Sequence, residues 1–411
     1  MMGGTDVEAV WRVESARIVA ALTRFTGDFG LAEDAAQEAV AEALTSWPRA
    51  SPANPAGWLM ATARRRAIDT IRRRAALHDR YAVLAADAQA AERETEPDGI
   101  GDDVLALMFV SCHPVLSREA RVALTLRVVG GLSSEEIARA FLVPVPTVQA
   151  RITRAKKTIA AAGVPFELPP AGERRARLGG VLSVLYVIFT EGSTATSGDR
   201  LLRPGVAYEA IRLIRTLAAL QPGEPEVHGL LALCELTAAR FPARTTRDGA
   251  PVLLGDQDRR LWDPAAIHRG LAALARASKR GLGPYALQAA IAAVHAAAPS
   301  VEATDWDRIV LLYEALGRVA PSPLADLNRA VAVAMAGRPA EALVIVDDLA
   351  GRLPGSHLVP TVRGELLTRL GRLREARAEL ETAARSCAND RERAVLLRKA
   401  AAIAARTPEG G

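Results

Sequence analysis

An all-α fold is predicted from the composition of the chain and from the period of its apolar residues. Of 411 residues, 50% are hydrophobic but only 4% are aromatic. Alanine, leucine and arginine are abundant, and all three favour helices. Apolar residues recur every three or four positions, whereas strand-like alternation is hard to find. A chain of this length is expected to hold two to four domains.

Cysteine usage and hydropathy favour a reduced, cytoplasmic protein without a membrane partner. Cys112, Cys234 and Cys387 are scattered and show neither disulfide nor metal-ligand spacing. The first residues lack the basic start and apolar run of a secretory signal. No stretch of about 18 apolar residues could span a bilayer, and the most apolar run, residues 181–189, is predicted to be a core helix.

Acidic and basic residues form alternating blocks in the first third of the chain, although the whole sequence carries a net charge of only +5. Residues 28–44 hold five acids and no base, and residues 64–74 hold six arginines and one acid. Residues 87–103 are again acidic, whereas residues 151–157 hold four bases and no acid. A generic solvated surface would be more mixed.

Two amphipathic helices are predicted over residues 31–47 and 54–74. Helical periodicity gives the first an inward stripe of Leu31, Ala35, Ala39, Val40 and Leu44, and the second a stripe of Leu59, Ala63, Ala67 and Ile71. The acids of the first helix suit a basic protein partner, and Trp58 with the arginines of the second could hold single-stranded DNA. Plain solvated acidic and basic faces are the alternatives.

A helix-turn-helix is predicted over residues 131–160. Ser133 and Glu136 have the spacing of a capping box, which satisfies free backbone N–H groups at a helix start. This helix should run to about Phe141, because Pro144 forbids its continuation.

The second helix of this pair has one apolar face and one polar, basic face. Pro146 suits its first turn. The apolar stripe is predicted at Val148, Ile152, Ala155 and Ile159, and the opposite face carries Gln149, Ala150, Thr153, Arg154 and Lys157. Uncharged polar side chains lie near the start of this helix, and basic side chains lie further along it. This order fits a recognition helix, in which the first group contacts the edges of DNA bases and the second contacts phosphates. An ordinary helical hairpin with a solvated face is the alternative.

Three stretches of the chain resemble, in the same order, the segments of bacterial sigma factors of the extracytoplasmic-function (ECF) group of the sigma-70 family. They are AEDAAQEAVAEAL, AGWLMATARRRAIDTIRRR and GLSSEEIARAFLVPVPTVQARITRAKKTI. The resemblance implies one helical domain that binds RNA polymerase core and the −10 promoter element. It implies a second helical domain that binds the −35 element.

Roles for individual residues follow from this resemblance. Core polymerase would contact Asp34, Gln37 and Glu38. The −10 element would contact Trp58, Arg64, Arg65, Arg66, Asp69 and Arg72, and the −35 element would contact Thr147, Gln149, Arg151, Arg154 and Lys157. The turn before the last set reads Val-Pro-Val-Pro, which departs from the Ser-like helix cap usual in the family.

The expected domains follow the same order. Sigma region 2 is expected over residues 1–82 and sigma region 4 over residues 104–163, joined by an acidic linker over residues 83–103. Within the family such a linker threads the polymerase channels. Beyond a Pro/Gly-rich junction, a C-terminal extension is expected to comprise a helical middle domain, residues 174–285, and repeats resembling tetratricopeptide repeats (TPR), residues 286–408.

An internal repeat supports the last of these domains. Four pairs of identical residues lie 34 positions apart, which is the tetratricopeptide period: Gly337 and Gly371, Arg338 and Arg372, Glu341 and Glu375, Ala342 and Ala376. Such arrays bind protein partners. The stretch LLGDQDRRLWD, residues 253–263, is either a folded loop with internal ion pairs or a docking surface, and it resembles the extension of a TPR-bearing ECF subgroup.

The expected function is that of a sigma factor, which binds RNA polymerase core and directs promoter-specific transcription initiation, regulated in cis by the extension. A helix-turn-helix DNA-binding regulator that does not act as a sigma factor is the alternative. No enzyme activity, cofactor or metal is expected, because the six histidines show no ligand spacing and no phosphate-binding glycine motif is present.

Overall fold

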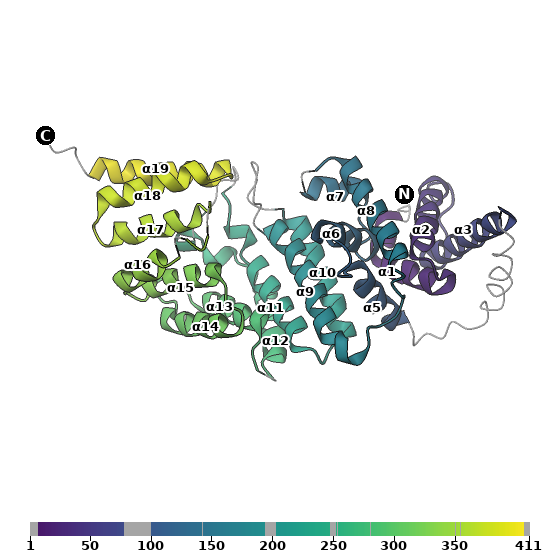
Figure 1. Cartoon of the computed structure of the whole chain (residues 1–411), viewed down its shortest axis with the longest axis horizontal. Coiled ribbons are helices and arrows are strands. Elements are labelled where there is room, and N and C mark those ends of the chain that lie inside the picture. The colour runs from purple at the N-terminus through teal and green to yellow at the C-terminus, as the bar shows by residue number, and fades with distance from the viewer. Residues whose placement is uncertain are drawn as a thin grey trace. The chain divides into compact units, whose positions relative to one another are not determined.

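The computed structural model describes residues 7–77, 100–141, 143–193, 203–246, 252, 254–279, 281–349, 351–353 and 355–406. Within these ranges every regular element is helical, and β-type pairing is limited to isolated bridge positions at Thr245, Lys279, Gly281 and Asn389 (Figure 1). The all-α prediction is therefore confirmed. The chain forms two compact units, Met1–Ile188 and Phe189–Gly411. None of the described helices combines the length and the apolar composition needed to cross a bilayer.

The first unit begins with three helices that pack against one another: α1 (Val7–Thr26), α2 (Phe29–Ser46) and α3 (Pro55–Leu77). Asp28 begins α2 as its N-cap, because its Oδ1 accepts a hydrogen bond from the N–H of Leu31 at 3.0 Å. The predicted inward residues are buried on α2 at Leu31, Ala35 and Ala39, and on α3 at Leu59, Ala63 and Ala67.

The expectation for Leu44 is wrong, because its side chain is 51% exposed. The buried row of α2 instead continues from Ala39 to Ala43, which is four residues further along and therefore on the same face. Val40 and Leu44 lie at the edge of that face, where they line a small cavity.

The second half of this unit contains α5 (Ile100–Ser111), α6 (Arg118–Val128), α7 (Ser134–Phe141) and α8 (Val145–Ala161). Helices α6 and α7 both pack against α8, and α5 packs against α1. The expected linker falls outside the described residues except for its last four positions, which belong to α5. The helix α9 (Ala171–Ser193) follows and contains the apolar run 181–189, whose buried side chains confirm a core helix.

The helix-turn-helix has the predicted local structure. The N–H of Glu136 donates to Ser133 Oγ at 3.1 Å, and the N–H of Ser133 donates to Glu136 Oε2 at 2.8 Å, so the capping box is confirmed. Pro146 lies in the first turn of α8. All four residues of the predicted stripe are at most 5% exposed: Val148, Ile152, Ala155 and Ile159.

The second unit is an array in which each helix packs against its neighbour in the chain. Its α-helices are α10 (Pro204–Leu220), α11 (Pro225–Ala238), α12 (Pro264–Ala277), α13 (Pro284–Ala297), α14 (Trp306–Val319), α15 (Pro323–Met335), α16 (Pro339–Asp347), α17 (Leu358–Arg369), α18 (Leu373–Ser386) and α19 (Asp390–Arg406). Short 3₁₀ turns occur at η4 (Phe241–Ala243), η5 (Leu254–Asp256) and η6 (Arg259–Leu261). Many helices begin with proline, whose fixed φ and missing N–H suit a first turn.

The two copies of the internal repeat share one local structure. Gly337 and Gly371 have φ values of 87° and 74°, which glycine adopts without strain. The N–H of Arg338 bonds to Val333 O, and that of Arg372 bonds to Leu367 O, which closes the preceding helix in the same way. Ala342 and Ala376 are both fully buried. That these helix pairs are tetratricopeptide repeats stays a prediction.

Candidate nucleic-acid interface

The helix α8 carries most of the residues expected at the −35 element away from its buried stripe, whereas Arg151 lies next to that stripe. Gln149, Arg154 and Lys157 are exposed, whereas Thr147 and Arg151 are partly buried. No acid occurs between residues 145 and 161. The exposed side of α8 therefore carries polar and basic side chains and no acid, besides small apolar residues such as Pro146 and Ala150. Polar and basic side chains of this kind can contact base edges and phosphates.

The basic helix α3 exposes only part of its expected −10 set. Arg65 and Arg72 are exposed, and Asp69 is partly buried. Arg66 instead donates to Glu42 of α2 at 2.6 Å. This hydrogen bond and the charge of the same carboxylate raise the pKa of Arg66, so its charge is already partly balanced within the protein.

Two further residues of this set pack against aromatic rings of the same unit. The ring of Trp58 meets that of Trp47 edge to face, with 5.6 Å between the centroids. The Arg64 guanidinium lies 4.6 Å from the centre of the Phe25 ring. Each side chain therefore already makes one ring contact within the unit.

A buried ion cluster joins the acidic helix α2 to α6 and α8. Glu33 is 3% exposed, and its carboxylate accepts hydrogen bonds from Arg127 at 3.1 Å and from Lys156 at 2.9 Å. Lys156 also donates to Asp34 at 2.6 Å. Although burial opposes it, the two carboxylates together raise the pKa of Lys156. Lys156 of α8 therefore partly covers Asp34, the first residue expected to contact polymerase.

The other two residues expected to bind core polymerase differ in exposure. Glu38 is exposed and lies 4.0 Å from Arg66. Gln37 is partly buried, and its Nε2 has no hydrogen-bond partner among the described residues. It lines a cavity of about 190 Å³ together with residues of α1, α2 and the helix-turn-helix.

The helix-turn-helix also touches α1. Arg12 forms an ion pair with Glu136, the capping-box acid. Gly131 has φ 72°, and a Cβ at this position would approach Ser15 Oγ to 2.7 Å. Only glycine fits here without strain or movement of α1.

Sequence reasoning missed the residues that join the two halves of this unit, above all Glu33, Arg127 and Lys156. The ion pairs connect positions 94 and 123 residues apart, which no spacing rule relates. The one available signal was Glu33 itself, an acid directly after the buried Ala32 and three residues before the buried Ala36. A carboxylate in an apolar stripe requires a cationic partner.

One group of side chains in the described part of the chain could hold a metal ion. Its donors, from His357, Cys387 and Glu392 in the second unit, lie within 4.8 Å of one another. Nitrogen, sulfur and oxygen donors suit Zn²⁺. The same atoms also satisfy one another, since His357 Nε2 lies 3.4 Å from the Glu392 carboxylate and Cys387 Sγ donates to Glu392 Oε2 at 3.8 Å.

Comparison with known families matches both halves of the first unit. The family described as Sigma-70 region 2 matches residues 12–76, and that described as Sigma-70, region 4 matches residues 106–159. The chain belongs to the sigma-70 family. Its helical C-terminal extension agrees with a sigma factor of the extended ECF type.

Individual relatives extend the comparison. A protein from two strains of Mycobacterium tuberculosis, named "Probable ECF RNA polymerase sigma factor SigI", is 29% identical over 210 residues, covering 49% of this sigma factor and 69% of the relative. An uncharacterized protein of Rhizobium meliloti (strain 1021) is 45% identical over 383 residues, covering 92% of this chain and 90% of the relative. Residues 177–278 match a family of unknown function, DUF6596.

Proposed function

We propose that this sigma factor binds RNA polymerase core in the cytoplasm and directs promoter-specific transcription initiation. In this proposal α2 contacts core through Asp34, Gln37 and Glu38. The −10 element contacts α3, and the −35 element contacts α8 through Gln149, Arg154 and neighbouring residues. The observation that carries the proposal is the acid-free exposed side of α8, held in place by four buried residues on its other side.

The contacts within the first unit make the described arrangement a closed one. Promoter elements at −10 and −35 lie roughly 25 base pairs apart, or about 85 Å at 3.4 Å per base pair. The helix α8 is joined to α2 through the Lys156–Asp34 pair at 2.6 Å, and α2 packs directly on α3. The two DNA-binding helices must therefore separate before both promoter elements can be bound.

We further propose that the extension regulates this step in cis. The helix pairs over residues 286–408 would offer a surface for a protein partner, as arrays of paired helices do. The middle domain, residues 174–285, would connect that surface to region 4. A signal on the extension would then change the balance between the closed and the DNA-bound arrangement.

A pull-down with RNA polymerase core tests the assignment of α2. The double variant Asp34→Lys with Glu38→Lys should lose at least 90% of core binding. Each substitution replaces a negative charge with a positive one, which repels a basic partner. The matched control reverses two exposed acids of the second unit, Asp307→Lys with Asp390→Lys, and should bind like the wild type. Unchanged binding of the α2 variant would reject the assignment. Failure of the wild type to bind core would favour the simple DNA-binding regulator.

A further inference from the structure

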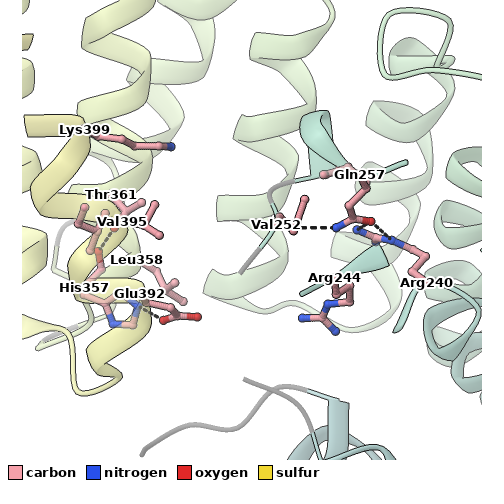
Figure 2. A pocket seen from close by; sticks show the side chains of 12 residues that line it. Arg240, Arg244, Val252, Gln257, His357, Leu358, Thr361, Glu392, Val395 and Lys399 are labelled. Atoms are coloured by element: carbon pink, nitrogen blue, oxygen red, sulfur yellow. Dashed lines mark hydrogen bonds and ion pairs between the residues drawn. The ribbon is translucent and has the colours of Figure 1, made fainter. Parts of the chain in front are cut away.

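A cavity of about 420 Å³ lies within the second unit. Figure 2 shows its two walls, with Arg240, Arg244 and Gln257 on one side, and Glu392 and Lys399 on the other. The first wall follows α11 along the chain, and the second is formed by α17 and α19. A cavity of this size accommodates a small organic molecule.

Arg240 is the least balanced charge of this cavity. Its Nε and Nη2 donate to Gln257 Oε1 at 3.3 and 3.2 Å, and its guanidinium lies 5.3 Å from the centre of the Trp262 ring. Among the described residues, no carboxylate pairs with it. Burial, together with the neighbouring charges of Arg244 and Arg259, lowers the pKa of Arg240 to about 10. A partly buried cation without an acid is unfavourable unless an anion joins it.

The remaining charges of the lining are also mainly positive. Arg244 donates to Ser193 O at 2.7 Å, and Lys399 pairs with Glu365. Against the cations Arg240, Arg244 and Lys399, the lining holds one carboxylate, that of Glu392. Much of the rest is apolar and comprises Val252, Leu254, Leu358, Val395 and Leu396. The lining therefore combines a cationic end with an apolar surface.

We propose that this cavity binds a small organic anion, whose carboxylate or phosphate group pairs with Arg240 while its apolar body lies against Leu358, Val395 and Leu396. The guanidinium presents a planar set of donors that matches both kinds of anion. Its Nη1 donates no hydrogen bond to a described residue and is available for the ligand. Every residue of this site belongs to the second unit.

Residues 254–263 shape the cationic wall. Gln257 donates through Nε2 to Val252 O at 3.1 Å, which fixes its Oε1 toward Arg240. Trp262 is buried, and its ring lies within cation–π distance of both Arg240 and Arg259. Two further residues have internal roles, since Asp258 pairs with Arg260 and Asp263 caps α12. The charged residues Asp258, Arg260 and Asp263 therefore stabilise the loop itself, whereas the uncharged Gln257 and Trp262 hold Arg240 in place.

Calorimetric titration of the full chain tests the proposal with three probes that share one apolar body: octanoate, octyl phosphate and octylammonium. Saturable binding of at least one anion with a Kd below about 1 mM is expected, with no binding of octylammonium. Binding of octanoate alone would assign a carboxylate ligand, and binding of octyl phosphate alone a phosphate ester. Absence of binding by both anions up to about 10 mM, or equal binding of octylammonium, would overturn the proposal.

Three variants locate the binding. Arg240→Gln should weaken anion binding at least tenfold, because the charge-assisted hydrogen bonds are lost. Val395→Phe should do the same by filling the cavity while leaving every arginine in place. Arg385→Gln, an exposed arginine of α18 outside the cavity, should bind like the wild type. Wild-type affinity in Val395→Phe, or in a folded Arg240→Gln, would place the anion elsewhere and reject the site.

Discussion

Glu33 joins three helices of the first unit through one buried carboxylate. Its partners Arg127 and Lys156 are themselves only 18% and 17% exposed. Removing the shared acid would therefore leave two cations in a poorly solvated place. Breaking such a buried pair costs about 3–5 kcal/mol, far more than loss of an exposed pair.

The variant Glu33→Gln should accordingly lower the unfolding free energy of the first unit by about 3 kcal/mol. Asp34→Asn is the matched control, because Asp34 shares Lys156 but is 61% exposed, and it should cost at most about 1 kcal/mol. Urea denaturation followed by circular dichroism measures both values. Equal effects of the two substitutions would show that the cluster does not depend on its buried member.

The stability of the second unit should depend on pH through His295. Burial, followed by the charges of Arg240 and Arg259, lowers its pKa from 6.5 to about 4. Its ring packs edge to face with Trp306 at 5.3 Å. The folded protein thus keeps this ring neutral at a pH where the unfolded chain protonates it, so stability is lost as pH falls from about 6.5 toward 4.

Substitution His295→Phe keeps an aromatic ring and removes the titration. The thermal midpoint of the wild type should therefore fall more steeply than that of the variant between about pH 6.5 and 4.5. At pH 7 and above, the difference between the two midpoints should be constant. Parallel curves across the whole range would exclude His295 as the titrating group.

At the scale of elements, substitutions on the exposed side of α8 are expected to separate contacts with DNA bases from contacts with phosphates. In the polymerase complex, Lys157→Ala should weaken binding to all promoters alike and reduce the slope of log K against log salt by about 1. Gln149→Ala should instead alter the preference among −35 sequences and leave that slope unchanged. Fluorescence anisotropy on labelled promoter DNA at several salt concentrations distinguishes these effects.

Arg385→Ala, in the second unit, is the control for this series and should change neither quantity. If Lys157→Ala left the slope unaltered, α8 would not be a phosphate-contacting helix. Loss of binding to all DNA sequences with Gln149→Ala would argue for a structural role of Gln149 in place of base readout.

Local signals predicted α7 and α8 well, because each depends on neighbours within a few residues. The Ser133–Glu136 cap and the stripe from Val148 to Ile159 follow from hydrogen-bond geometry and helical periodicity alone. The same periodicity failed at Leu44, since only the packing of α1, α2 and the helix-turn-helix decides how wide the buried face of α2 is.

Long-range contacts could not be predicted in this way. Sequence spacing does not relate Glu33 to Arg127 and Lys156, and it does not bring Arg240 toward a wall formed by α17 and α19. Nor did it show that Arg66 would be paired with Glu42. The sequence therefore predicted which residues are candidates for contact with polymerase or DNA. It did not predict which of them are exposed and which are paired within the protein, because that depends on tertiary structure.

At the scale of the whole molecule, we propose that the closed arrangement of the first unit opposes binding to polymerase. Lys156→Ala removes its link to Asp34 while Arg127 still balances Glu33. Core polymerase should bind this variant about fivefold more tightly, equivalent to about 1 kcal/mol. Surface plasmon resonance with immobilised core measures the change, and weaker binding would mean that Lys156 contacts polymerase itself.

Run-off transcription tests the central claim most directly. Core polymerase is combined with the full chain on a library of upstream regions, with core alone and the variant Asp34→Lys with Glu38→Lys as controls. Promoter-specific transcripts are expected with the wild-type chain, and none with either control. Upstream DNA bound by the chain without any transcript from the complex would contradict a sigma factor and leave a simple DNA-binding regulator.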